Sequence, residues 1–255
     1  MNVAGALSKP LRGVGGLVGM AYDTMLQSVR PPFAWREFLL QCWFVSRVSI
    51  LPTLLMSIPF TVLAVFAINV LLLQIGAADF SGSGAALGAV TQIGPMVTVL
   101  VIAGAAATAM CADLGARTIR EEVDALEVLG INPIQALVVP RVAAGTLVSV
   151  MLSGLVIITG LAGGFFFSVY IQHVTPGAFV AGLTVLTGLP ELLIAIIKAG
   201  LFGLSASLIA CYKGLSVGGG PAGVGNSVNE TVVYSFLALF VINVIATAVG
   251  VKATT

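Results

Sequence analysis

Residues 113–132 read DLGARTIREEVDALEVLGIN, and this stretch decides how the chain is arranged. Between Asp113 and Glu127 it holds seven of the 21 charged side chains of the protein, which divide into 11 basic and 10 acidic ones. The 33 residues before it, 80–112, carry no charge. A charge near the centre of a bilayer costs about 2.5 to 3.5 kcal/mol on insertion scales. Seven neighbouring charges must therefore lie at a membrane surface, next to apolar sequence that crosses the membrane.

The composition supports this placement. Of the 255 residues, 58% are hydrophobic and 8% are charged, whereas a soluble domain carries about 25% charged residues. There is too little polar surface to cover a soluble body, so we expect an all-α integral membrane protein. The net charge is +1, and it gives no indication of a nucleic-acid partner. The three cysteines, which lie far apart in apolar sequence, are interpreted as buried free thiols.

The uncharged runs predict about five transmembrane helices within one domain, residues 1–255, because about 20 apolar residues span a bilayer. The predicted spans are residues 48–78, 84–112, 134–171, 189–212 and 229–251. The segment from Thr175 to Thr187 is too short to cross and is expected to lie along the outer surface. An extra span that uses residues 175–197 remains an alternative.

The first 47 residues form a separate, interfacial region in this interpretation. Apolar residues recur there in steps of three and four, which places them on one stripe of a helix. The stripe consists of Val3, Leu7, Leu11, Val14, Val18, Tyr22, Met25 and Val29. This pattern favours an amphipathic helix in the headgroup layer, and a helix packed on protein is the alternative. A second short amphipathic piece, residues 35–47, follows Pro31-Pro32.

The distribution of basic residues predicts the orientation. Five lie in the first 47 residues, Arg117 and Arg120 lie between spans two and three, and Arg141 lies near the start of span three, whereas Lys252 lies on the opposite side. Because positive side chains favour the cytoplasm, the N-terminus and the charged segment, residues 113–131, are predicted to be cytoplasmic. Five spans then place the C-terminus outside.

The charged segment itself is predicted to be a short amphipathic helix, with Ile119, Val123 and Leu126 on one side. One interpretation is a solvated loop helix. The other is a docking surface that transmits force from a cytoplasmic partner into the spans. The residue pattern alone leaves both open.

A longer stretch resembles a known family. Residues 94–144, GPMVTVLVIAGAAATAMCADLGARTIREEVDALEVLGINPIQALVVPRVAA, are similar to the signature region of MlaE/YrbE-type permeases, the membrane subunits of ABC transporters for lipids. The matching parts are Gly94-Pro95, an acidic residue before Leu-Gly, EEVDALEVLGINP, PRVAA and, further on, KAGLFGLSASLIACYKG. The family's usual glutamate before Leu-Gly is Asp113 here, which keeps the charge and shortens the reach. The ARTIREE motif resembles the actinobacterial versions that work with Mce proteins.

The resemblance implies a non-catalytic subunit of the bacterial inner membrane whose segment 117–129 is a coupling helix for a separate ABC ATPase. The implied ATPase-coupling residues are Asp113, Arg117, Arg120, Glu121, Glu122, Asp124, Leu126, Glu127 and Leu129. ATP and Mg²⁺ would be bound by that partner, since this chain has no GxxxxGK[ST] motif, and no catalytic residue, metal site or cofactor is expected in it. Further implied partners are a second YrbE-type permease, giving a heterodimer, periplasmic Mce-domain proteins and the lipid substrate.

A second candidate site lies in the predicted fourth span. Glu191 and Lys198 are two helical turns apart, about 10 Å along the axis, and Phe202 and Ser205 are added to the same candidate cavity. These residues either line a lipid path or serve a structural role, such as an interhelix ion pair. Two functional alternatives remain: an ion-coupled secondary transporter that uses Glu191 and Lys198, and a structural membrane scaffold.

Overall fold

The computed structural model describes residues 3–77, 80–185 and 187–254, and these form helices and connecting turns without any strand. Five helical stretches among them are long and apolar enough to cross a membrane. The prediction of an all-α membrane protein with five spans is confirmed. They cover Trp35–Leu72, Ser81–Ile119, Ile134–Tyr170, Leu189–Leu215 and Gly220–Gly250.

The first, fourth and fifth spans are single long helices. These are α2 (Trp35–Gln74), α9 (Leu189–Leu215) and α10 (Gly220–Thr254). The piece predicted to be a separate amphipathic helix at 35–47 is the beginning of α2, which continues through Pro52 and Pro59. Helix α10 begins well before the predicted start at residue 229.

The second and third spans contain π-helical turns. The second span runs through α3 (Ser81–Leu87), η2 (Gly88–Ile93), α4 (Gly94–Val101), η3 (Ile102–Ala106) and α5 (Ala107–Ile119). The third consists of η4 (Ile134–Val138) and α7 (Val139–Tyr170). Pro95 has no backbone N–H for an α-helical hydrogen bond, and the wide turn η2 directly precedes it. Such π turns frequently occur at functional sites.

Two glycines allow α7 and α9 to approach each other closely. A Cβ atom on Gly145 would lie 1.9 Å from Ser207 Oγ, and one on Gly203 would lie 2.5 Å from the Gly145 carbonyl oxygen. The Ser149 hydroxyl donates to the Ala199 carbonyl across the same contact, at 2.6 Å. Small residues let membrane helices approach closely enough for such packing. A larger side chain at either glycine would therefore push the third and fourth spans apart.

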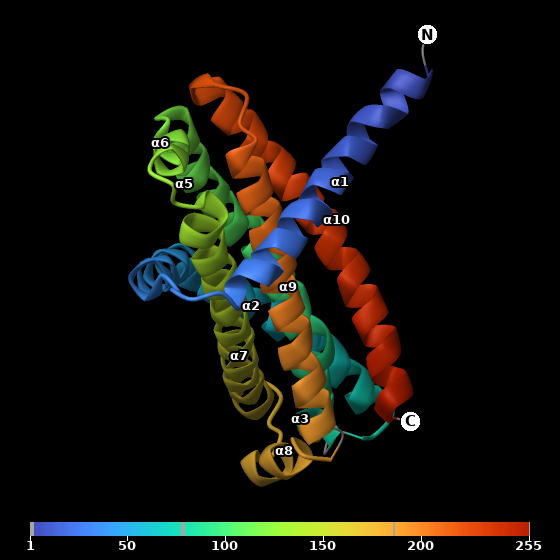
Figure 1. Cartoon of the computed structure of the whole chain (residues 1–255). Helices are drawn as coiled ribbons and strands as arrows, with labels where there is room; N and C mark the ends of the chain where they lie inside the picture. The colour runs from blue at the N-terminus through green and yellow to red at the C-terminus, as the bar shows by residue number, and fades with distance from the viewer. Residues whose placement is uncertain (1–2, 78–79, 186, 255) are drawn as a thin grey trace.

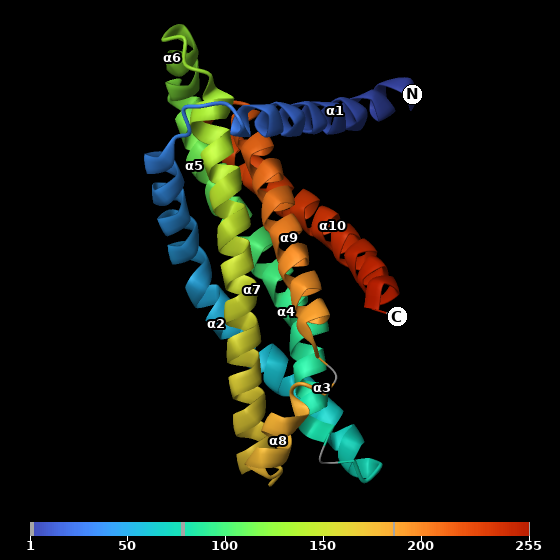
Figure 2. The same cartoon turned by 60° about the horizontal axis from the view of Figure 1, so that its bottom comes forward.

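The short helices mark the two ends of the bundle. Figure 2 shows α1 (Val3–Ser28) lying across the long helices at the end that carries α6 (Glu122–Val128), and α8 (Pro176–Gly182) at the opposite end. We call these the α6 end and the α8 end. Helix α8 has seven residues and α9 starts only at Leu189, so residues 175–197 do not form an additional span.

Helix α1 contacts the bundle with one face and leaves its apolar stripe uncovered. Met20 and Thr24 are buried, and Gly16 lies close to the Tyr212 ring on α9. The stripe residues Val14, Val18, Tyr22, Met25 and Val29 are all exposed. The side chains of Val3, Leu7 and Leu11 lie outside the described set. The helix therefore packs on protein and still presents an apolar face, and its burial in a headgroup layer remains a prediction.

The orientation can be tested with one cysteine at each end. Ser28 on α1 and Thr175 beside α8 are both exposed. We expect a membrane-impermeant maleimide to label Thr175→Cys in intact cells and Ser28→Cys only in inside-out vesicles. The unmodified protein is the control, since Cys111 and Cys211 are buried and Cys42 is half-buried. Labelling of Ser28→Cys in intact cells would show that the N-terminal end of the bundle faces the outside, opposite to the predicted orientation.

Candidate functional site

The charged segment is divided into two helices by a left-handed residue. Glu121 has φ of 59°, which ends the α5 helix and starts α6. A non-glycine residue in this region of backbone space costs about 1 to 3 kcal/mol. Such strain persists only where the surrounding structure determines it, so the change of direction at Glu121 is a specified feature of the segment.

The other end of α6 is closed by a Schellman motif. Gly130 has φ of 74°, its N–H donates to the Glu127 carbonyl, and the Ile131 N–H donates to the Leu126 carbonyl, both at 2.9 Å. These bonds satisfy carbonyls that a helix end would otherwise leave free.

Helix α6 is held to the bundle by two side chains and exposes the rest. Val123 is buried and Leu126 half-buried in an apolar cluster with Leu114, Leu137 and Val138. The remaining side chains of residues 121–129, here called the acidic tip, are exposed. They include Glu121, Glu122, Asp124, Glu127, Val128 and Leu129. Val128 is 87% and Leu129 72% exposed, so the tip combines acidic groups with uncovered apolar ones.

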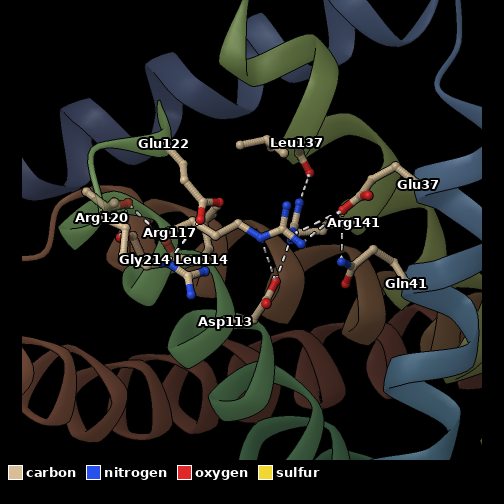
Figure 3. Close-up of polar contacts among 11 residues, drawn as sticks. Glu37, Gln41, Asp113, Leu114, Arg117, Arg120, Glu122, Leu137, Arg141 and Gly214 are labelled. Carbon is tan, nitrogen blue, oxygen red and sulfur yellow. Dashed lines mark hydrogen bonds and ion pairs between the residues drawn. The ribbon is translucent and has the colours of Figure 1, made fainter. Parts of the chain in front are cut away.

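A buried arginine lies between the carboxylates of Glu37 and Asp113, as Figure 3 shows. Arg141, from the start of α7, is fully buried. Its Nη2 contacts Asp113 Oδ2 at 2.7 Å and Glu37 Oε1 at 3.2 Å, and its Nη1 donates to the Leu137 carbonyl at 2.9 Å. Burying a guanidinium is tolerated only when charge and hydrogen bonds compensate it. The two carboxylates provide that compensation.

Two further polar side chains complete the group. Arg117 approaches Asp113 at 3.6 Å and Glu37 at 3.8 Å, and Gln41 Nε2 donates to Glu37 Oε1 at 3.1 Å. We call Arg141, Asp113, Glu37 and Arg117 the arginine cluster. Its two cations and two carboxylates balance, and they come from α2, α5 and α7. The cluster therefore ties three spans together at the α6 end.

The structure separates the predicted coupling residues into two groups. Asp113 and Arg117 lie in the arginine cluster, with side-chain exposures of 30% and 28%. Arg120, Glu121, Glu122, Asp124 and Glu127 are exposed on or beside α6. Sequence reasoning did not assign Glu37, Gln41 or Arg141 to any site. Arg141 could have been recognised from the sequence, because it directly precedes a long uncharged run. A charge at the start of a membrane span needs a partner of opposite charge.

The predicted cavity residues are also divided. A cavity of about 590 Å³ lies between α2, α3, η2, α9 and α10, and both Glu191 and Lys198 line it. Phe202 is instead packed in the main core, and Ser205 is half-buried away from the cavity wall. Glu191 Oε2 accepts a hydrogen bond from the Gly188 N–H at 2.8 Å. Within the described residues, Glu191 and Lys198 form no ion pair.

The five apolar helices define a multi-pass α-helical membrane protein that carries a cluster of charged groups at one end. Comparison with known proteins identifies the class further. Residues 38–249 match the family described as Permease MlaE. The chain belongs to the MlaE permease family, and the resemblance to MlaE/YrbE-type permeases noted in the sequence is confirmed.

Named relatives agree with this assignment. A probable ABC transporter permease protein of Synechocystis is 36% identical over 168 residues, which cover 66% of this chain and 64% of the relative. One from Rickettsia conorii is 27% identical over 262 residues, 98% of both chains. The Arabidopsis thaliana protein TRIGALACTOSYLDIACYLGLYCEROL 1, chloroplastic, is 31% identical over 150 residues, 59% of this chain and 43% of the relative.

The arginine cluster generates a stability prediction. Arg141→Gln leaves Asp113 and Glu37 with only the more distant Arg117 as a shared cation, and removing one partner of a buried pair costs about 3 to 5 kcal/mol. We expect the low end of this range, because Glu37 and Asp113 are 20% and 30% exposed. The measurement is the free energy of unfolding of the detergent-solubilised protein.

Arg120→Gln is the matched control. Arg120 pairs with Glu122 at 2.9 Å, but their side chains are 63% and 46% exposed, and exposed pairs contribute about 0 to 1 kcal/mol. Equal effects of the two substitutions would show that the arginine cluster does not hold the α6 end together.

Proposed function

We propose that this chain is the transmembrane permease subunit of an ABC-type lipid transporter of the bacterial inner membrane. In this proposal a separate ATPase binds at the α6 end, and its ATP-driven movements are relayed to the spans. Lipids or other hydrophobic molecules are thereby moved across the cell envelope. Membership of the MlaE permease family and the relatives named as probable ABC transporter permeases support the transporter class.

The observation that carries the proposal is the connection between the acidic tip and the arginine cluster. The tip begins directly after α5, which contributes Asp113 and Arg117 to the cluster. Through Arg141 and Glu37 the same cluster continues into α7 and α2. A force on α6 therefore reaches three spans through charged contacts as well as through packing.

The chemistry of the tip indicates what its partner presents. Four acidic residues and one basic residue occupy positions 120–127, so a complementary groove would be cationic. It would also cover Val128 and Leu129, whose exposure to water is unfavourable. Charge complementarity of this kind sets register and excludes wrong partners. The Thr118 hydroxyl, which donates to the Gly214 carbonyl of α9 at 3.1 Å, would extend the relay to the fourth span.

The lipid cargo is supported by the cavity and by one relative. The plant relative carries the name of a diacylglycerol lipid, and the cavity wall is mostly apolar. By the resemblance of the sequence, a second YrbE-type permease would form a heterodimer with this chain, and Mce-domain proteins would bind outside. The ion-coupled alternative gains no support, because the Glu191 carboxylate accepts the Gly188 N–H in the first turn of α9.

Charge reversal on the acidic tip tests the docking role. We expect Asp124→Lys combined with Glu127→Lys to give a normally inserted permease that no longer retains its ATPase, because attraction becomes repulsion. Loss of buried charged contacts costs about 2 kcal/mol or more, which is about thirtyfold in affinity. Copurification of the ATPase subunit in detergent and lipid uptake by cells are the two measurements.

Asp23→Lys is the matched control. Asp23 is exposed on α1 at the same end of the bundle, so its reversal changes the charge of that surface without touching α6. Retention of the ATPase and of full transport by the α6 double variant would show that α6 is only a solvated loop helix.

A further inference from the structure

The first turns of α2 carry two arginines and a tryptophan on the face that points away from the bundle. We call Arg36, Trp43 and Arg47 the α2 outer face, and all three are exposed. At about 3.6 residues per turn, their positions lie within about 40° of one another around the helix. Val45, which is fully buried, lies on the opposite side. The first turns of α2 also lie at the edge of the bundle in both views (Figures 1 and 2).

The two arginines of this face have no acidic partner among the residues that the structure describes. Glu37 is the one acidic side chain in the sequence of α2. It is turned inward, where it contacts Arg141 at 3.2 Å and Arg117 at 3.8 Å. Neither Arg36 nor Arg47 forms an ion pair or a side-chain hydrogen bond within the described ranges. The outer face therefore carries a net positive charge, and each guanidinium keeps its donors available.

The depth of Arg47 follows from the length of the uncharged part of α2. Residues 48–74 carry no charge and extend about 40 Å at about 1.5 Å per residue. The hydrocarbon layer of a bilayer is about 30 Å thick, so these residues span it completely. Arg47 lies at their α6 end, about 15 Å before Ser57, which accepts the Thr159 hydroxyl of α7 at 3.0 Å. A long arginine side chain at this position reaches the headgroup layer.

Trp43 and aliphatic side chains surround Arg47 on the exposed side of the helix. Trp43 is 71% exposed and precedes Arg47 by about one turn. Its indole N–H makes no hydrogen bond within the part of the chain that the structure describes. Tryptophan is enriched at membrane interfaces, where its ring contacts apolar chains and its N–H stays in polar surroundings. Leu40, Ile50 and Leu51 are exposed beside these two residues, so the polar donors border an apolar surface.

We propose that the α2 outer face binds an anionic phospholipid of the leaflet at the α6 end. Arg47 and Trp43 donate to the lipid phosphate, the acyl chains lie along the exposed aliphatic side chains, and Arg36 adds a second positive charge. A guanidinium matches phosphate oxygens with two parallel hydrogen bonds. A net negative lipid fits this face better than a zwitterionic one, whose own cation the two arginines would repel.

The predicted orientation agrees with this choice of lipid. It places the α6 end at the cytoplasmic leaflet, whose negative surface potential attracts basic residues next to a span. The proposal requires that the chain spans a membrane. It goes beyond the proposed function, since it depends neither on transport nor on an ATPase partner, and its test involves neither.

The protein contains its own reporter of the bound lipid, because Trp43 is one of two tryptophans. Trp35→Phe leaves Trp43 as the single indole of the full chain. This protein is reconstituted into vesicles of phosphatidylcholine and phosphatidylglycerol at a fixed ratio, and either lipid is replaced stepwise by its form with brominated acyl chains, which quenches nearby indoles. We expect the apparent association constant at Trp43 to be about fivefold or more higher for phosphatidylglycerol.

Variants of Arg47 assign the preference to this face. In the same background, Arg47→Gln should reduce the preference to about twofold or less, and Arg47→Lys, which keeps the charge, should retain most of it. Arg120→Gln is the matched control, because it removes an exposed arginine of the same end that does not belong to α2. Arg47 has no partner to lose within the described chain, so Arg47→Gln should unfold in detergent at the same temperature as its parent.

Three results would overturn the proposal. Equal quenching of Trp43 by the two brominated lipids would do so without any arginine variant. A preference that survives Arg47→Gln would show that another group attracts the lipid. Weak quenching by both lipids would show that protein covers the face instead, as a second copy of the chain or the helix of a partner would.

Discussion

The fully buried guanidinium of Arg141 imposes the constraint on which the α6 end depends. A fixed charge in this position requires carboxylates from elsewhere in the chain, and the structure supplies Asp113 from α5 and Glu37 from α2. These partners lie 28 and 104 positions away in the sequence. The requirement therefore sets the relative position of three spans, which apolar packing in a membrane specifies less strictly.

The two ends of the bundle are consequently built in different ways. At the α6 end, charged contacts join α2, α5 and α7, and α1 lies across the helices (Figure 1). Lys213 of α9 also pairs with Glu230 of α10 there, at 2.5 Å. Toward the α8 end, a neutral contact joins α2 to α7, since Asn69 donates to Ser168 Oγ at 2.8 Å. The α6 end is therefore held by charged contacts, and the α8 end by neutral ones.

Much of this arrangement could be predicted from the sequence because a bilayer limits the possibilities. Five apolar runs gave five spans, and the charges between Asp113 and Glu127 had to lie at an end. The exposed and buried sides of α6 followed from helical spacing, with Val123 inside and Asp124 outside. Helix bounds were less accurate: Glu121 ends a helix through a left-handed backbone that glutamate rarely adopts, and no residue pattern signals it.

Side-chain pairing was the part that sequence could not provide. Glu191 and Lys198 share a helix face two turns apart, and the sequence left open whether they line a lipid path or pair with other helices. In the structure Glu191 caps its own helix, and both residues line the cavity. Arg141 clearly needed an acid, but Asp113, Glu37 and several residues of α6 were all candidates. Which acid pairs with Arg141 depends on how helices that are distant in sequence pack against each other. The residue pattern of one sequence does not reveal that packing.

We expect α6 and the starts of α2 and α7 to move as one unit. This expectation is tested most directly by measuring the distance between spin labels at Asp124 on α6 and Arg36 on α2 in the transporter with its ATPase, first with ADP and then with ATP trapped. The account predicts the same distance in both states, and a changed distance when Arg141 is replaced by Gln. A distance that changes between the two nucleotide states in the otherwise unaltered protein would contradict it, because α6 would then move independently of the spans.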